Sequence, residues 1–194
     1  MKNLLILLLL PMFLLSCSND DDNNSENFEE KFITDSRDGQ IYETVRIGNQ
    51  TWFAENLNFD KGDFRSSCYD NDELNCVLLG RLYENITAIS CPDGWHIPTK
   101  EEWEELFDYL GGINVAHLLV EPGATFQGNQ VNFNLLPAGR RAPQIGSYDF
   151  GTGGYYATSS ANQNNLPYYV EYIPEQSIEI KAGNFSKSCR CLKD

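Results

Sequence analysis

The sequence predicts an α+β domain: two or three helices followed by a twisted antiparallel sheet, with a hairpin at the N-terminal side. Three observations support this class. Residues 39–54 alternate apolar and polar side chains about a Gly-Asn turn, as the strands of a half-buried hairpin do. Residues 99–110 have a helical apolar period. From residue 134 onward, short apolar runs alternate with turn residues, which is typical of antiparallel strands.

The N-terminal hairpin is expected to have strands over residues 39–47 and 51–54, joined by the tight turn Gly48-Asn49. A polar loop that contains two cysteines follows. Residues 79–89 then show a weaker helical pattern, because three apolar side chains lie about one turn apart. These are Leu82, Ile86 and Ile89.

The strongest helical pattern begins at Thr99. Thr99 is the N-cap, and Glu102 three residues later completes a capping box that satisfies free backbone amides. The apolar residues that follow share one face: Trp103, Leu106, Phe107 and Leu110. Gly111-Gly112 ends this helix, and a short helix is expected over residues 114–120.

The sheet is expected to consist of short strands separated by turns. They cover residues 134–139, 154–158, 168–173, 177–180 and 188–192. Because the helices precede most of the strands, the pattern favours an α+β architecture over alternating βαβ units.

Residues 1–16 have the layout of a secretory signal peptide: Lys2 is followed by an apolar run of about a dozen residues. A membrane span needs roughly 20. Because Cys17 lies directly at the cut, the segment resembles a bacterial lipoprotein signal. In such proteins this cysteine becomes the acylated first residue, so we expect palmitate or a similar lipid at Cys17 that anchors the chain to a membrane. A plain secretory signal and a retained anchor are the alternatives.

Residues 17–31 are expected to form a disordered acidic tether, because residues 18–27 offer no apolar side chain to bury. Acidic runs just behind a lipidated cysteine resemble the surface-export signals of Bacteroidetes lipoproteins, although a plain solvated linker is the alternative. We therefore expect an outer-membrane protein exposed at the cell surface, with the periplasmic face as the alternative. A single domain should occupy residues 32–194.

The net charge of −14 argues against nucleic-acid binding, because a phosphate backbone is bound by clustered lysine and arginine. It also argues against a polybasic contact with anionic lipid. The acidic balance is better explained by solubility at a crowded surface.

Five cysteines remain after Cys17, and outside the cytoplasm disulfides are the default expectation for them. Cys68 and Cys76 flank a turn-rich loop and could form a local bridge. Cys91 could pair with Cys189 or Cys191, because residues two apart in a strand point to the same face. On the chain-entropy model the long bridge stabilises by about 4.7 kcal/mol and the short one by roughly 2.6. Zinc is disfavoured, because neither close pair has the ligand spacing of a zinc knuckle.

Eight blocks of the sequence resemble, in order, the Fibrobacter succinogenes major paralogous domain. They include IGNQTWFAENL at residues 47–57 and CPDGWHIPT at 91–99, and the others lie at 32–39, 68–71, 80–83, 136–139, 158–160 and 190–194. The family is distantly similar to C-type-lectin-like folds, including that of formylglycine-generating enzymes. The resemblance implies that Cys91 pairs with Cys191. Cys189 stands where the family has an apolar residue, so it is either a free thiol or a competitor for Cys91.

The sequence contains no Gly-x-Ser-x-Gly elbow and no phosphate-binding glycine loop. His96 is expected to pack in the turn before the capped helix. Residues 70–75 and 121–123 are the nearest calcium candidates, but neither carries a full ligand set. We therefore expect no cofactor, no metal and no catalytic residue.

Five tyrosines could stack on sugars, although tyrosines more often pack in the core. They are Tyr148, Tyr155, Tyr156, Tyr168 and Tyr169.

These observations favour a surface-tethered lipoprotein that acts as a binding or interaction module for glycan or cell-surface ligands. Two alternatives remain. One is a thiol-dependent enzyme related to formylglycine-generating enzymes, with Cys189 as its nucleophile. The other is a structural envelope lipoprotein.

Overall fold

The computed structural model describes residues 31–120, 123–126 and 129–194. The predicted signal peptide, Cys17 and the acidic tether up to residue 30 lie outside these ranges. Within the part of the chain that the structure describes, no helix is long and apolar enough to cross a membrane.

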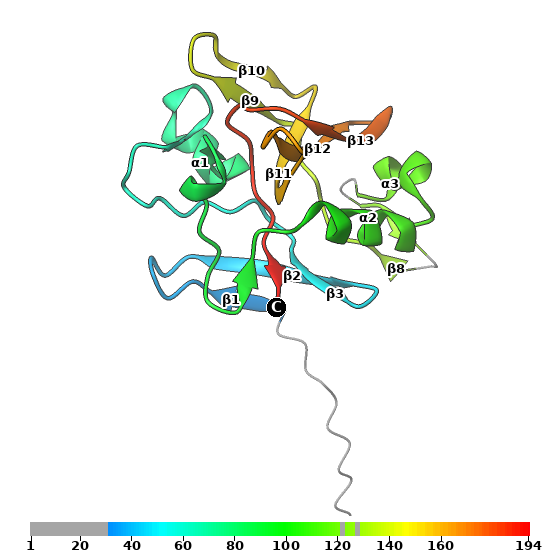
Figure 1. Cartoon of the computed structure of the whole chain (residues 1–194). Coiled ribbons are helices and arrows are strands. Elements are labelled where there is room, and N and C mark those ends of the chain that lie inside the picture. The colour runs from blue at the N-terminus through cyan, green and yellow to red at the C-terminus, as the bar shows by residue number, and fades with distance from the viewer. Residues whose placement is uncertain (1–30, 121–122, 127–128) are drawn as a thin grey trace, which may run out of the picture.

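The first sheet has five strands in the order β1-β2-β3-β14-β6. Strand β1 (Phe32–Thr34) pairs with β2 (Ile41–Ile47), and β2 continues through a turn into β3 (Gln50–Phe53), which confirms the predicted hairpin. Strand β14 (Leu192–Lys193) lies between β3 and β6 (Trp95–His96). The C-terminal strand is therefore held in the same sheet as the N-terminal hairpin (Figure 1).

The second sheet also has five strands, in the order β10-β9-β11-β12-β13. They are β9 (Ala138–Ala142), β10 (Gly146–Phe150), β11 (Gly154–Ala161), β12 (Pro167–Ile173) and β13 (Ser177–Ala182). Neighbouring strands are antiparallel, except that β9 and β11 meet in parallel at Gly139 and Gly154. Together with the helices, these sheets make the domain α+β.

Helix α2 (Lys100–Tyr109) has the predicted capping box between Thr99 and Glu102. It is followed by α3 (Ile113–Leu119), and the two helices pack on the second sheet. Trp103 of α2 is fully buried, with its ring centroid 4.8 Å from that of Trp52 in β3 and 5.9 Å from that of Tyr156 in β11. This aromatic group joins the helices to both sheets.

The remaining elements are short. Strand β4 (Ser66–Ser67) pairs with β5 (Leu82–Tyr83), and β7 (Thr125–Phe126) pairs with β8 (Asn129–Gln130). The 3-10 helices η1 (Tyr69–Asn71) and η2 (Ile86–Ala88) and the short helix α1 (Glu73–Leu79) lie between these strands or beside them in the chain.

The helix predicted over residues 79–89 is wrong. The helix in this region is α1, which lies inside the predicted polar loop because Asp72 caps its first turn and Gly80 ends it at a φ of 72°. Residues 82–83 form β5, and Asn85 caps the separate η2. The apolar residues spaced about one helical turn apart therefore belong to two different elements, β5 and the region of η2.

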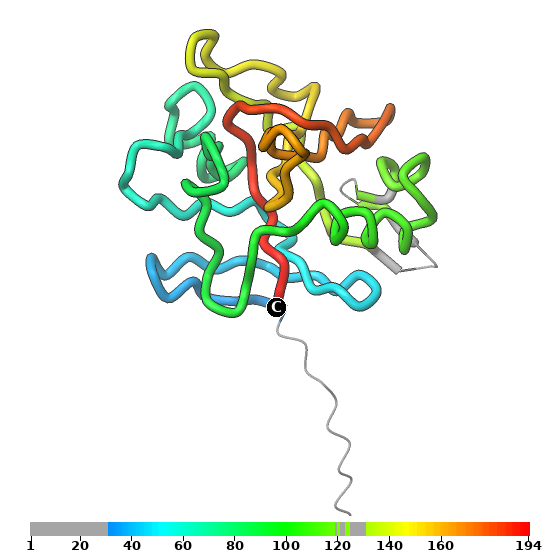
Figure 2. Tube along the Cα trace, viewed as in Figure 1, coloured from blue at the N-terminus to red at the C-terminus, as the bar shows by residue number. Residues whose placement is uncertain are grey.

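Two predicted strands also differ from the structure. The strand at 134–139 begins only at Ala138, after Pro137, and runs on to Ala142. Residues 188–192 do not form one strand: residues 186–188 make isolated bridges to three different neighbours, and β14 begins at Leu192. Figure 2 shows the reason, since this last segment runs from the second sheet to the first.

Candidate functional site

The segment that joins the two sheets carries two of the cysteines predicted from the sequence as site residues, Cys189 and Cys191. Ser188 donates its backbone N–H to Tyr155 of β11, and the carbonyl groups of Cys189 and Cys191 accept from Leu57 and Phe53 at 2.9 Å each. Its side chains from Ser186 to Leu192 are all buried. The cysteines therefore lie in the core, at the junction of the sheets.

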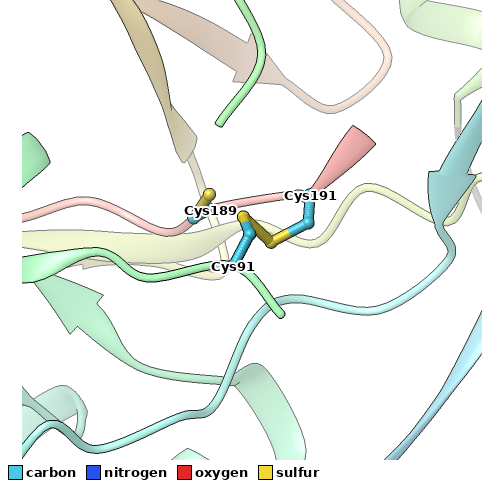
Figure 3. Close-up of side chains that lie close together, drawn as sticks. All are labelled: Cys91, Cys189 and Cys191. Atoms are coloured by element: carbon cyan, nitrogen blue, oxygen red, sulfur yellow. A yellow bond between two sulfur atoms is a disulfide. The ribbon is translucent and has the colours of Figure 1, made fainter. Parts of the chain in front are cut away.

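The sulfurs of Cys91, Cys189 and Cys191 form a cluster in which every pair of Sγ atoms lies within 4.8 Å. Cys91 and Cys191 form a disulfide with a Cα–Cα distance of 5.9 Å, and Cys189 is free beside it (Figure 3). Because two of the three sulfurs are bonded to each other, the cluster does not offer three thiolates to a metal. The pairing is the one that the family resemblance implied.

Cys189 is fully buried, and this burial raises the pKa of its thiol to about 12. The thiolate is the nucleophilic form of cysteine, so at neutral pH this side chain is in its unreactive form. Arg190 next to it lowers the pKa, but less than burial raises it. The environment of Cys189 is that of a small core residue.

Arg190 is completely buried, and its guanidinium is surrounded by oxygen acceptors. It donates to the carbonyl groups of Phe53 (3.2 Å), Phe133 (2.7 Å) and Asn134 (2.6 Å) and to Oδ1 of Asn56 (2.6 Å). A buried charge is tolerated when its donors are satisfied in this way. Arg190 thus ties the segment to β3 and to the chain that precedes the second sheet.

The second disulfide joins Cys68 and Cys76, with a Cα–Cα distance of 4.9 Å. It fixes α1 against the loop that precedes it, because Cys76 lies in the middle of the helix and is 3 % exposed. All four cysteines predicted to form disulfides are therefore bonded in the structure.

In the first calcium candidate, residues 70–75, several side chains are engaged in hydrogen bonds within the protein. In the segment 70–75, the Asp72 side chain accepts from the Leu74 backbone as a helix cap, and Asn71 Oδ1 accepts from Arg141 at 3.0 Å. Asn75 donates instead to the Tyr69 carbonyl group. Of the other candidate, residues 121–122 lie outside the described residues.

Three of the tyrosines considered as a sugar-stacking surface are buried. Tyr155, Tyr156 and Tyr169 are at most 6 % exposed, so they pack in the core and offer no stacking platform.

His96 is only half-buried, and its ring nitrogens contact Asp194 (2.6 Å) and Glu102 (3.0 Å). His96 is therefore held by hydrogen bonds as well as by packing, and it links Asp194, which follows β14, to the capping box of α2.

A cavity of about 230 Å³ opens where the short β4–β5 pair meets the end of β9. We call it the arginine cavity. Its lining residues are Phe64, Arg65, Ser66, Ser67, Glu84, Arg141, Pro143 and Ser186. The walls are joined by backbone hydrogen bonds, since Arg141 and Ser186 exchange both of theirs and Glu84 donates to Arg65.

The side chains of the arginine cavity combine an aromatic ring, charges and hydroxyl groups. Phe64 is 100 % exposed and has a φ of 61°, a strained conformation for a bulky residue. Glu84 and Arg141 form no ion pair with any residue that the structure describes, whereas Arg65 is paired with Asp63. The cavity thus presents a carboxylate and a guanidinium that are available to a ligand.

Sequence reasoning did not find the arginine cavity. Its residues come from four separate segments, so no local motif reveals it. The one usable signal is Phe64, a lone aromatic side chain in the polar stretch from residue 60 to residue 67.

The comparisons with known proteins give one result. No curated protein and no solved structure matches the chain. The profile of one family, described as the Fibrobacter succinogenes major domain, matches residues 45–193. This match covers most of the chain and contains both disulfides, the buried Arg190 and the arginine cavity. The chain belongs to the Fibrobacter succinogenes major domain family.

Proposed function

We propose that this protein is a surface-tethered lipoprotein whose folded domain binds a glycan or another hydroxyl-rich ligand of a cell surface in the arginine cavity. The observation that carries the proposal is the exposed ring of Phe64 beside the Glu84 carboxylate and the Arg141 guanidinium, which form no ion pair with the described residues. Binding sites of this kind are concave and have a few convergent polar groups that fix the orientation of the ligand.

The chemistry of the cavity suits a sugar. One face of a sugar ring is apolar and can lie on the Phe64 ring, which is fully exposed to solvent. The hydroxyl groups can then bind the Glu84 carboxylate, the Arg141 guanidinium and the serine hydroxyl groups. The cavity volume of about 230 Å³ is below the range of drug-sized sites, so it suits a single sugar unit.

The proposal includes a C-type-lectin-like fold. Support comes from the ordered sequence blocks, from the α+β architecture, and from the way the last strand enters the sheet of the first hairpin. It also includes lipidation of Cys17, with the domain held at the outer membrane by the acidic tether. Support for this part is the sequence of residues 1–31 alone.

The ligand proposal is tested on a glycan array and a panel of cell-surface proteins with the folded domain. Phe64→Ala and Arg141→Ala should each abolish or strongly weaken the binding that the unmodified domain shows. Phe32→Ala and Arg46→Ala are matched exposed controls on the first sheet and should bind normally. If no glycan or surface protein binds while a defined substrate is turned over, the proposal is wrong.

The tether is tested separately in cells. Cys17→Ser should move the protein from the membrane fraction to the soluble fraction, and protease shaving of intact cells should degrade the unmodified protein. Unchanged membrane association of the variant would show that another part of the chain is the anchor.

A further inference from the structure

Helix α1 exposes an apolar face to solvent. Leu74, Val77 and Leu78 lie at positions i, i+3 and i+4 and are 69 %, 76 % and 70 % exposed. A helix of a soluble domain ordinarily turns such a face toward the core. We call these three residues the α1 face.

The surrounding structure prevents α1 from burying this face. Cys76 lies in the middle of the helix and is held inward by its disulfide with Cys68. Asn56 donates from Nδ2 to the Leu79 carbonyl group at 2.8 Å. At Gly80 a Cβ atom would approach Asn56 Cβ to 2.6 Å, so the helix end is closely packed on this segment. The outward direction of the α1 face is therefore fixed by covalent and packing constraints.

A cavity of about 260 Å³ adjoins the α1 face, and Val77 and Leu78 form part of its wall. Across from them it is lined by Glu43 of β2 and by Glu55 and Asn58 of the segment after β3. We call this cavity the acidic groove. It shares no lining residue with the arginine cavity.

The polar side of the acidic groove carries two carboxylates. Glu55 is exposed and takes part in no ion pair with the described residues. Glu43 has one partner, Lys31, whose Nζ lies 3.5 Å away and whose side chain is 71 % exposed. Such a set of groups is complementary to N–H donors and to positive charge.

We propose that the α1 face and the acidic groove together form a docking site for a partner protein, in the form of a segment that places apolar side chains beside lysine or arginine. The apolar side chains would cover Val77 and Leu78, and the cationic groups would reach the carboxylates of Glu55 and Glu43. Apolar contact with a charged rim is the usual composition of a protein–protein interface.

The charge at this site decides against two other occupants. A second copy of the chain would bring the same carboxylates together, on a molecule whose net charge is already −14. Like charges facing each other across an interface are strongly unfavourable. An anionic lipid surface is repelled for the same reason. The inference goes beyond the proposed glycan site, because it concerns another surface and another class of ligand.

The probe is a fluorescently labelled synthetic peptide in which leucine and lysine alternate, and binding is followed by anisotropy at about 0.15 M salt. It should bind the unmodified domain. The double variant Val77→Ser/Leu78→Ser and the variant Glu55→Gln should each weaken binding by about tenfold or more, as expected at the centre of an interface. Ile145→Ser is the matched apolar control, since Ile145 is 75 % exposed, and Glu105→Gln is the matched acidic control.

Two further peptides separate the contributions. A serine–lysine peptide and a leucine–glutamate peptide should both bind much more weakly than the leucine–lysine peptide. If the serine–lysine peptide binds equally well, the attraction is net charge only and the docking site is refuted. It is also refuted if no peptide binds, or if the control variants lose as much affinity as the α1 variants.

The remaining occupants are measured directly. Sedimentation equilibrium that shows a dimer of the unmodified domain, lost in Val77→Ser/Leu78→Ser, would assign the α1 face to a second copy and overturn the proposal. Binding to anionic phosphatidylserine vesicles that is lost in the same variant would assign it to a membrane and also overturn it. Phe64→Ala should bind the peptide normally. The peptide test therefore does not depend on whether the arginine cavity binds a glycan. Circular dichroism and urea unfolding show that each surface variant is folded.

Discussion

Arg190 donates from Nε to Asn56 Oδ1 at 2.6 Å, and the same Asn56 side chain donates from Nδ2 to the last turn of α1. Asn56 is 5 % exposed, so this connection runs through the core. The segment that carries the clustered cysteines and the helix that carries the α1 face are therefore linked by one asparagine side chain. The position of α1 depends on the integrity of this buried pair.

Replacing Arg190 should strongly lower the free energy of unfolding. Arg190→Met removes the guanidinium that donates to four oxygens in and around the core, and breaking such a buried network costs roughly 3–5 kcal/mol. Urea unfolding of Arg190→Met, Asn56→Ala and the double variant measures the loss and the coupling. A coupling energy of about 0.5–3 kcal/mol is expected for contacting residues. Strictly additive losses would show that the two side chains do not act together.

The sulfur cluster predicts that one cysteine can replace another. In Cys191→Ser, the Cys91 and Cys189 sulfurs remain within 4.8 Å, so we expect a Cys91–Cys189 disulfide to form during oxidative folding. In Cys91→Ser the remaining sulfurs belong to Cys189 and Cys191, and a bond between residues two apart closes no long loop, so stability should fall by about 2–5 kcal/mol. Cys191→Ser should therefore be the milder variant. Peptide mapping under non-reducing conditions identifies the bond, and recovery of both Cys91 and Cys189 as free thiols would contradict this prediction.

Cys189 should be inert in the native protein. Burial raises its pKa to about 12, so a thiol-specific reagent at neutral pH meets a protonated and inaccessible side chain. Intact-mass measurement should show no label until denaturant is added, and one label afterwards. Rapid labelling of the native protein would instead support a thiol-dependent enzyme.

His96 should make stability depend on pH. Burial lowers its pKa, but the hydrogen bonds to Asp194 and Glu102 outweigh burial and the pKa is raised above 6.5. Protonated His96 therefore stabilises the folded state below the unfolded-state pKa, and this contribution is lost as the pH rises through the folded-state value. Urea unfolding from about pH 5 to about pH 8 should show the decline. In His96→Gln it should be absent, and in Asp194→Asn it should be smaller; the same slope in all three proteins would refute the role of His96.

Those elements whose signals are local were predictable from the sequence. The hairpin about Gly48-Asn49 and the helix capped by Thr99 follow from turn and capping residues that act within a few positions. The pairing of Cys91 with Cys191 followed from family resemblance, because spacing alone allows Cys189 equally well.

The rest depends on contacts between distant segments. Leu82 and Ile89 have helical spacing, yet they are buried from β5 and from the residue after η2, and only tertiary packing separates them. Helix α1 has an apolar face that burial would ordinarily explain, whereas a disulfide turns it outward. The arginine cavity exists because Arg141 and Ser186 pair across the chain, and no sequence pattern records that bridge.

Lys187 is a buried cation whose removal should stabilise the protein. Its Nζ lies 3.3 Å from the Gly183 carbonyl oxygen and 4.6 Å from the Phe185 ring centroid, and burial lowers its pKa from 10.5 to about 8. At neutral pH the folded state therefore bears the cost of a desolvated ammonium group. Lys187→Met should raise the free energy of unfolding at pH 7 by about 1–3 kcal/mol, as measured by urea unfolding.

The pH dependence distinguishes this effect from better packing. Because the folded-state pKa of Lys187 is the lower one, the unmodified protein should gain stability as the pH rises from about 8 toward 10.5, when only the unfolded state still binds the proton. The advantage of Lys187→Met should shrink over the same range. Lys187→Arg keeps the charge and should give no gain at pH 7, and Lys61→Met at an exposed position should leave stability unchanged. An advantage of Lys187→Met that is constant with pH would show that packing, not the buried charge, is responsible.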